Sequence, residues 1–168
     1  MSSSVPTSPD FLIRRAVLGD IPALAHHRVS MFRDMGETTE LLEGPLTDAS
    51  AAFFSGAIES GVYVAWLAVP RHEPDLVVGG AGVLLRPMLP RPAPAGVVQG
   101  REALIANVYT EPAWRRRGLA ALLMQHVLDF TRASGIQRVL LHASKDGRPL
   151  YESLGFVPTN EMRLVPPG

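Results

Sequence analysis

Residues 103–134 combine a strand, a turn of three arginines and an amphipathic helix, and this order restricts the fold more than any other feature. Residues 103–110 have the composition of a strand. The predicted helix, 118–134, has apolar residues at helical spacing, with Gly135 just past its end: Leu119, Leu123, Val127 and Phe130. A short strand follows at 139–142. Strand, helix and strand in this order predict one parallel crossover in an α/β sheet.

Further segments have the composition or periodicity of regular elements. They predict strands at 11–17, 62–69, 75–85 and 161–165, helices at 19–36 and from Asp48 to Gly61, and a short helix around 149–151. Consecutive strands in the middle of the chain predict hairpins, and four prolines between Arg86 and Gly96 predict a loop. Residues 1–10 are predicted to be a disordered lead-in, and 11–168 a single domain.

Composition excludes several classes of function. The 168 residues include no cysteine, which excludes disulfides, cysteine metal sites and a thiol nucleophile. The 16 basic and 16 acidic residues cancel, so we expect neither nucleic acid nor a membrane as partner. The sequence contains no His-x-x-x-His pair, so it does not predict a metal site. The first ten residues lack a signal-peptide pattern, which predicts a cytoplasmic protein. Lys145 is the only lysine, and the bias toward arginine favours a bacterial source.

Three arginines at the start of the predicted helix are unexpected. The N-terminus of a helix is the positive end of its dipole, where each added cation costs roughly 0.3–1 kcal/mol. Arg115, Arg116 and Arg117 place three cations there. They are either solvated at a loop edge or compensated by a bound polyanion. Backbone N–H groups at a helix start, together with a glycine and cations, form a phosphate site.

Arg115-x-x-Gly118-x-Ala120, between a strand and an apolar helix, resembles the acyl-CoA motif of the GNAT superfamily of N-acetyltransferases. The resemblance implies a GNAT fold of the α/β (α+β) class, with a mostly antiparallel mixed sheet, one parallel β-α-β crossover and helices on both faces. It implies acetyl-CoA as cosubstrate and no metal. The residues it assigns to the cofactor are Val108, Tyr109 and Thr110, whose backbone meets the pantetheine arm, and Arg115, Arg116, Arg117, Gly118, Leu119 and Ala120, which meet the phosphates.

A second element, Leu150-Tyr151-Glu-Ser-Leu-Gly155-Phe156, is similar to the Leu-Tyr-Glu-x-x-Gly-Phe element of the same family. The resemblance implies that Tyr151 stands near the thioester sulfur and protonates the departing thiolate. Many members have Asn and Ala seven and four residues before this tyrosine, where this chain has Ser144 and Gly147. We expect Ser144 to contact the cofactor from this position.

The reaction that the resemblance implies is acetyl transfer to a primary amine by direct attack on the thioester. The acceptor is a small molecule or a peptide, and dimerisation, common in the family, implies a homodimer. The group that deprotonates the amine stays open between Glu102, His142 and water. His26 and His27 are adjacent on a helix, so at most one of them faces the acceptor.

Two other functions remain alternatives. A non-catalytic acyl-CoA sensor would have the same fold, and Tyr151 argues against it. A partner-binding protein would use the proline-rich segment 86–96 as its docking segment. Two nucleotide sites are excluded: Pro87 interrupts a dinucleotide fingerprint that begins at Gly79, and Lys145 is not followed by Ser or Thr as a P-loop requires.

Overall fold

A five-stranded sheet forms the centre of the protein in the computed structural model, which describes residues 8–167. Its strands lie in chain order: β1 (Phe11–Arg15), β2 (Tyr63–Pro70), β3 (Gly79–Ala93), β4 (Gly96–Thr110) and β5 (Val139–Leu141). The first three pairings are antiparallel, and β4 pairs with β5 in parallel. The mixed sheet with one parallel crossover, predicted from residues 103–142, is confirmed.

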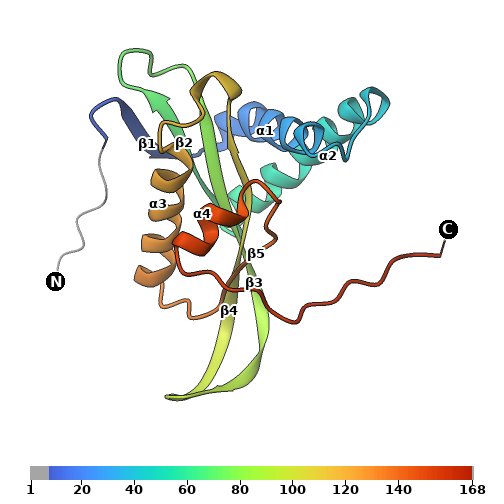
Figure 1. Ribbon diagram of the computed structural model, residues 1–168, viewed down its shortest axis with the longest axis vertical. Coiled ribbons are helices and arrows are strands. Elements are labelled where there is room, and N and C mark those ends of the chain that lie inside the picture. The colour runs from blue at the N-terminus through green and yellow to red at the C-terminus, as the bar shows by residue number, and fades with distance from the viewer. Residues whose placement is uncertain (1–7, 168) are drawn as a thin grey trace.

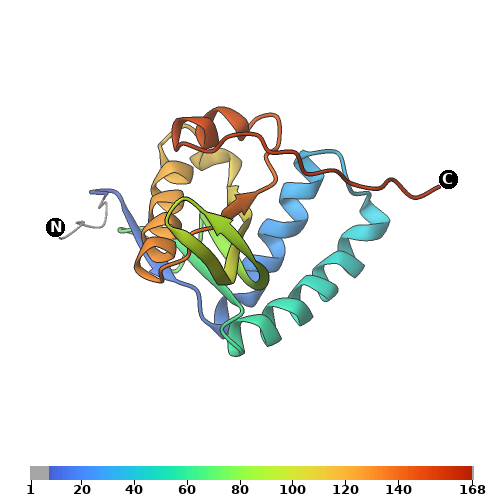
Figure 2. The same ribbon diagram turned by 90° about the horizontal axis from the view of Figure 1, so that it is seen from below.

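Helices cover both faces of this sheet, as predicted. On one face lie α1 (Ile21–Asp34) and α2 (Glu40–Glu59), and on the other lie α3 (Leu119–Ala133) and α4 (Arg148–Ser153) (Figures 1 and 2). Short 3-10 turns at Leu18–Asp20 and Pro112–Trp114 precede α1 and α3. We call the two sides of the sheet the α1–α2 face and the α3 face.

Two separate hydrophobic clusters fill the two faces. On the α3 face, alternate residues of β3 pack with Leu123, Met124 and Val127 of α3. On the α1–α2 face, Leu24 and Phe54 pack with Tyr63, Ala65 and Leu67 of β2. The period-2 alternation of the strands separates these clusters.

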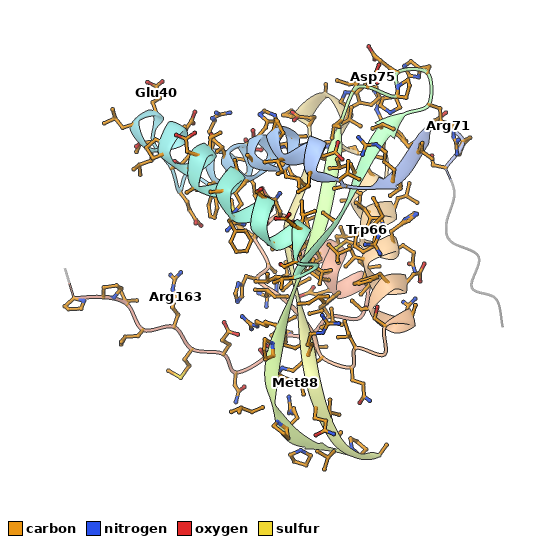
Figure 3. The ribbon with its side chains drawn as sticks, turned by 180° about the vertical axis from the view of Figure 1, so that it is seen from behind. Glu40, Trp66, Arg71, Asp75, Met88 and Arg163 are labelled. Atoms are coloured by element: carbon orange, nitrogen blue, oxygen red, sulfur yellow. The ribbon has the colours of Figure 1, made fainter. Side chains whose placement is uncertain are left out.

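The proline-rich segment 86–96, predicted as a loop, is instead part of a long β-hairpin. Strands β3 and β4 stay paired from Leu85↔Ala103 to Ala93↔Gly96, with an irregularity between Met88 and Arg91. Neighbouring strands end earlier: β2 reaches only Leu84, and β5 begins opposite Ala103. The hairpin therefore continues as a two-stranded ribbon whose outer edges are unpaired, and proline is tolerated on such edges. Figure 3 shows Met88 in this ribbon.

Two other predictions of secondary structure are wrong. Helix α2 begins at Glu40 rather than after Asp48, with Pro45 inside it. Its early start is tied to α1, because Arg33 binds Glu43 through two hydrogen bonds. The predicted closing strand at 161–165 is irregular and pairs with no strand in the described part of the chain. It runs away from the body (Figure 3, Arg163), with Met162 and Leu164 about nine-tenths exposed.

The predicted disordered lead-in lies mostly outside the described residues, since the structure begins at Ser8. The carbonyl of Ser8 accepts a hydrogen bond from Arg71 Nε, and the carbonyl of Asp10 accepts one from the Arg71 amide.

Candidate functional site

A β-bulge interrupts β4 at Asn107. Gly80 pairs with Tyr109 and Gly82 with Ala106, so two residues of β4 face one residue of β3. Asn107 has a left-handed backbone with φ of 60°, which asparagine tolerates better than most residues. Its amide nitrogen donates to the carbonyl of Leu24 over 3.1 Å, which ties α1 to the bulge. Bulges bend and twist a strand.

Beyond this bulge β4 separates from β5. The parallel pairs are Ala103↔Val139, Leu104↔Leu140 and Ile105↔Leu141, and no later pair exists in the described residues. Val108, Tyr109 and Thr110, predicted to meet the pantetheine arm, therefore lie on a stretch of β4 whose outer edge is unpaired. Backbone N–H and C=O groups there need other partners.

The side chains of this stretch alternate between the two faces. Val108 packs against the cluster of the α3 face. Tyr109 is buried on the α1–α2 face, where its ring lies 5.3 Å from that of His27. Thr110 Oγ1 is buried without a hydrogen-bond partner. These side chains fix the strand from both sides and leave its edge exposed to a ligand.

The three arginines lie in the turn between β4 and α3, but their environments differ. Arg115 binds Asp34 of α1 and donates from Nε to the carbonyl of Thr110, and the hydrogen bond to Asp34 raises its pKa. Arg117 stacks over the ring of Trp114 at 4.8 Å. Arg116 has no ion pair or side-chain hydrogen bond to any residue from 8 to 167. Of the three cations, Arg116 therefore best fits the expectation of a free charge.

The turn that carries these arginines also exposes its backbone. Arg116 and Gly118 both have left-handed conformations, with φ of 62° and 75°. Left-handed residues in the turn before a helix can orient successive N–H groups toward one anion, and we call residues 116–118 the nest for this reason. A Cβ added to Gly118 would meet nothing within 4 Å, so the approach is open. Leu119 buries its side chain in the α3 face, while Ala120 is half-buried one residue further into the first turn.

Tyr151 lies on α4, half-buried against the α3-face cluster. Burial raises the pKa of its hydroxyl, which keeps the proton on the oxygen at neutral pH. Its ring meets that of Phe156 edge to face at 6.2 Å. Ser144 lies one turn earlier, and its Oγ accepts a hydrogen bond from the Gly147 amide over 3.1 Å. Ser144 thus stabilises the turn that precedes α4.

The departure from the family pattern at Gly147 has a local reason. A Cβ there would lie 2.9 Å from Tyr151 Cε2 and 3.1 Å from Ser144 Oγ. An alanine would displace one of these groups. The absence of a side chain at Gly147 therefore allows both the hydrogen bond to Ser144 and the observed position of the Tyr151 ring.

The two side chains considered as bases are both engaged. Glu102 is 8% exposed and accepts hydrogen bonds from Arg86 (2.6 Å) and Arg138 (2.7 Å). Glu102 is therefore a buried carboxylate paired with two arginines rather than a solvated charge at the strand edge. His142 is exposed and its Nε2 lies 3.0 Å from Glu161 Oε1 in the C-terminal segment.

Sequence reasoning placed at most one of His26 and His27 at the acceptor, and the structure separates them sharply. His26 is exposed, with Nε2 2.7 Å from Glu111 Oε1. His27 is 1% exposed, and burial lowers its pKa from 6.5 to about 4. Its ring is neutral at pH 7, so its 3.9 Å approach to Glu111 is not an ion pair there. Gly80 of β3 was the overlooked signal, because a Cβ at that position would lie only 3.1 Å from His27 Nδ1.

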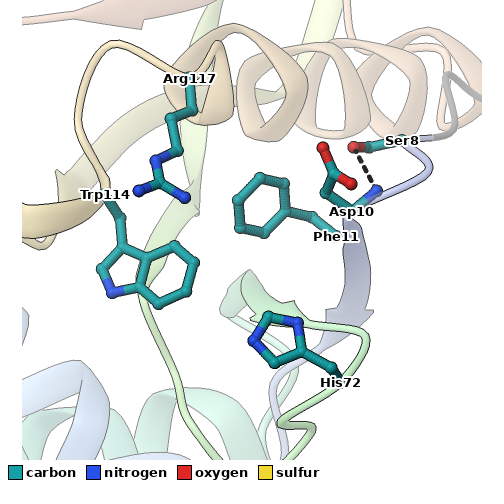
Figure 4. Close-up of a pocket in the computed structure, with 6 residues that line it drawn as sticks. All are labelled: Ser8, Asp10, Phe11, His72, Trp114 and Arg117. Atoms are coloured by element: carbon teal, nitrogen blue, oxygen red, sulfur yellow. Dashed lines mark hydrogen bonds between the residues drawn. The ribbon is translucent and has the colours of Figure 1, made fainter.

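Two clefts flank the turn at Pro112–Trp114. One, of about 530 Å³, is lined by Ser8, Asp10, Phe11, His72, Trp114 and Arg117 (Figure 4). The other, of about 560 Å³, lies between His26, Glu111 and residues 76–78. Neither reaches Val108 or Tyr151, so the unpaired edge of β4, rather than a closed cavity, is the feature that joins the predicted residues.

Within residues 8–167, no group of three or more His, Asp or Glu side chains could hold a metal ion. None of the helices in the same range is long and apolar enough to cross a membrane.

Comparison with known proteins decides the family. A family model of the acetyltransferase (GNAT) domain matches residues 92–165, which include β4, the arginine turn, α3 and α4. The chain is also 31% identical to the glucosamine 6-phosphate N-acetyltransferase of Trypanosoma brucei brucei over 150 residues, 82% of this chain and 92% of that protein. The chain belongs to the GNAT acetyltransferase family. Acetyl transfer is the activity that this membership implies.

Solved structures agree with this GNAT assignment. A GCN5-related N-acetyltransferase from Ralstonia eutropha superposes with a TM-score of 0.82 at 27% identity, covering 94% of this chain and 99% of that one. The structure of a predicted acetyltransferase from Clostridium acetobutylicum with acetyl-CoA gives a TM-score of 0.77 at 25% identity, with coverage of 93% and 96%. GNAT proteins use acetyl-CoA, and the backbone nest at Arg116–Gly118 fits a group rich in phosphate.

Proposed function

We propose that residues 11–168 form one catalytic domain that transfers an acetyl group from acetyl-CoA to a primary amine. A single observation carries this proposal: the unpaired edge of β4 runs from the bulge at Asn107 directly into the nest at the start of α3. An extended ligand with an amide-bearing arm and a phosphate group matches such a path, because the strand edge offers hydrogen bonds and the nest offers N–H groups.

Each part of the path has a proposed role. Main-chain groups of Val108, Tyr109 and Thr110 bind the pantetheine arm. The N–H groups of Gly118, Leu119 and Ala120, with the charge of Arg116, hold the pyrophosphate. Arg115 and Arg117 shape the turn through Asp34 and Trp114 and add charge near the phosphates. Ser144 lies before α4, where it positions the turn that leads to Tyr151 and contributes a further polar contact to the cofactor.

The chemistry follows from direct attack. The amine nitrogen forms a bond to the thioester carbonyl carbon, the C–S bond breaks, and the sulfur leaves as a thiolate that takes a proton from the Tyr151 hydroxyl. The nitrogen loses a proton to a base. Glu102 is held by two arginines, so His142 and water are the remaining acceptors of that proton.

Thermal unfolding with and without acetyl-CoA tests the binding site. A ligand at 100 times its dissociation constant stabilises by about 2.7 kcal/mol. In Gly118→Val this gain should disappear, because the side chain covers the nest. Gly135→Val is the matched control, since Gly135 also has a positive φ (67°) and open space but lies at the other end of α3. An equal loss of the acetyl-CoA shift in both variants would contradict the site.

Replacement of Tyr151 by Phe tests the acid. A thiolate leaving group departs without much help, so turnover should fall by roughly 10²-fold, the lower end for general acid catalysis, with acetyl-CoA binding nearly unchanged. Unchanged turnover would assign the proton to water. Wild-type turnover at background with tight acetyl-CoA binding would favour the sensor instead.

Two further properties belong to the same proposal. We propose a cytoplasmic location, and we infer a bacterial source from the arginine-rich composition. We also propose a homodimer, because Met162, Leu164 and Val165 expose apolar side chains in an unpaired segment and β5 has one unpaired edge. Light scattering of the full chain and of Met162→Asp checks this, and a concentration-independent monomer for both would contradict it.

A further inference from the structure

Three polar groups on the α1–α2 face and at the β4 bulge have no hydrogen-bond or ion-pair partner among residues 8–167. They are the Arg28 guanidinium, the Tyr63 hydroxyl and the Asn107 Oδ1 atom. Polar groups in protein interiors are nearly always paired, so each exception needs a reason.

Arg28 is a half-buried cation without an acid. Its guanidinium lies 4.7 Å from the centre of the Phe32 ring, and it forms no ion pair or hydrogen bond with the residues that the structure describes. Burial lowers its pKa. Desolvation of an unpaired cation is unfavourable, and an anion that binds with the acceptor would remove this cost.

The Tyr63 hydroxyl is buried in the same region. Tyr63 is 3% exposed, its oxygen has no hydrogen-bond partner, and its pKa is raised by burial and held back by the nearby charge of Arg28. The oxygen points at Gly82, where an added Cβ would lie 1.9 Å from it. Arg28 and Tyr63 are therefore electrostatic neighbours, and the Tyr63 hydroxyl occupies the space that the missing side chain of Gly82 leaves.

Asn107 connects this place to the proposed reaction centre. Gly82 pairs with Ala106, which precedes Asn107. The Asn107 amide holds the carbonyl of Leu24, one turn before Arg28 on α1. Val108, proposed to lie against the pantetheine arm, follows Asn107. An acceptor that enters over the α1–α2 face would thus meet Arg28 with one end and the thioester with the other.

We propose that the acceptor is an amine that carries an anionic group, a carboxylate or a phosphate, and that Arg28 binds this group with the Tyr63 hydroxyl as a second donor. The inference rests on the proposed function and specifies its substrate. The guanidinium fork matches both kinds of oxyanion. Polyamines and exposed protein lysines fit poorly, because they bring a second positive charge instead of an anion.

Matched acceptor pairs test the charge requirement. Glucosamine 6-phosphate is compared with glucosamine, and L-alanine with L-alaninamide, by thiol release from acetyl-CoA. Hydrogen bonds to charged groups are among the stronger ones, so the anionic member of at least one pair should have a kcat/KM about 10- to 100-fold higher. The pair that discriminates identifies phosphate or carboxylate. Calorimetric titration of the same compounds into the CoA-bound protein gives a readout that needs no turnover.

Arg28→Gln then removes the proposed contact. It should raise KM for the anionic acceptor about 10- to 100-fold and leave KM for acetyl-CoA unchanged. The melting temperature of the unliganded protein should stay the same or rise slightly. Arg132→Gln on the α3 face is the control and should keep the discrimination. Arg28→Lys keeps the charge without the fork and should give an intermediate KM.

Several outcomes would overturn the inference. One is an equal kcat/KM, or equal binding, of the two members in both acceptor pairs. Another is a fall in the melting temperature of unliganded Arg28→Gln that is large enough to explain its loss of activity. In those cases acetyl-CoA binding and turnover of neutral amines would still support the proposed function. Failure of the wild-type protein to bind acetyl-CoA would instead remove the proposed function itself.

Discussion

The two faces of the sheet are built from the same strands but in different ways. Toward α3, strand β3 presents Ala81, Val83 and Leu85, which pack against α3 side chains that are completely buried. Toward α1 and α2, the same strand presents Gly80 and Gly82 in the intervening positions. A side chain added at Gly80 would lie 3.1 Å from His27 Nδ1 and 3.0 Å from Leu67 Cδ2.

The two faces also differ in how well their buried polar groups are hydrogen-bonded. Thr131, a buried residue of α3, donates its hydroxyl to the carbonyl of Leu128. Four buried side-chain atoms have no hydrogen-bond partner among residues 8–167. Three of them, His27 Nδ1, Tyr63 Oη and Asn107 Oδ1, lie on the α1–α2 face, and the fourth, Thr110 Oγ1, lies near Leu123 at the end of β4. The difference teaches that the α3 face supplies stability, while most of the unpaired polar groups lie on the other face beside the proposed reaction centre, as functional sites often do.

The largest effect should come from the α3 face. Leu123→Ala removes a completely buried side chain and should destabilise the protein by about 3–5 kcal/mol, the transfer of its atoms plus the cavity left behind. Urea unfolding measures this loss. If Leu123→Ala lost less unfolding free energy than the changes on the α1–α2 face described in the next paragraphs, the contrast between the faces would be contradicted.

A dependence on pH should come from the other face. The folded-state pKa of His27 is about 4 and its ordinary value is 6.5, so the unfolded chain binds more protons in between. Stability is therefore complete above pH 6.5 and falls by about 3 kcal/mol as pH drops to 4. Unfolding of His27→Gln at several pH values should show a flatter slope than wild type. Equal slopes in His27→Gln and the wild type would contradict the buried neutral ring.

Crowding at Gly82 should have the next largest effect. Gly82→Ala forces Tyr63 to move and should cost about 1–3 kcal/mol, as overpacking of a core does. Gly56→Ala, in an exposed and open position of α2, should instead stabilise by up to about 1 kcal/mol. Adding Tyr63→Leu to Gly82→Ala should cost less than the sum of the two single changes. Strict additivity would show that the two residues do not compete for the same space.

The smallest expected effect comes from removing one hydroxyl group on each face. Tyr63→Phe removes a hydroxyl that has no partner, so the unliganded protein should change by less than about 1 kcal/mol or gain stability. Thr131→Val on the α3 face removes a satisfied hydroxyl and should lose about 1 kcal/mol. Equal losses in the two variants, measured by urea unfolding, would mean that Tyr63 has a partner after all.

The sequence was most informative where local pattern and tertiary structure agree. The strand from Ala103, the helix from Leu119 and the strand from Val139 follow from periodicity alone, because each buries the face that its pattern marks. The ribbon at 86–96 was missed, since prolines predict a loop unless both strands are known to lie beyond their neighbours. The strand at 161–165 failed for the opposite reason: its composition favours a strand, but no described strand lies beside it.

For the candidate site, the sequence predicted positions but not environments. It grouped Arg115, Arg116 and Arg117 as three equivalent cations, because the partner of Arg115, Asp34, lies 81 residues earlier in the chain. Arg28 lies in the predicted helix 19–36, and no pattern in the sequence distinguishes it from its neighbours. Its isolation depends on which acids are absent nearby in space, and sequence does not give that information.

The bulge at Asn107 has a consequence for the parity of β4. Before it, the odd-numbered residues Ala103 and Ile105 face α3; after it, the even-numbered Val108 does so, and Tyr109 turns toward His27. A strand that ran regularly through Asn107 with every residue kept would send the tyrosine ring into the packed interior beneath α3 and turn the valine toward α1. The extra residue at the bulge therefore resets the alternation, and it is what places Val108 under α3 and Tyr109 beside His27.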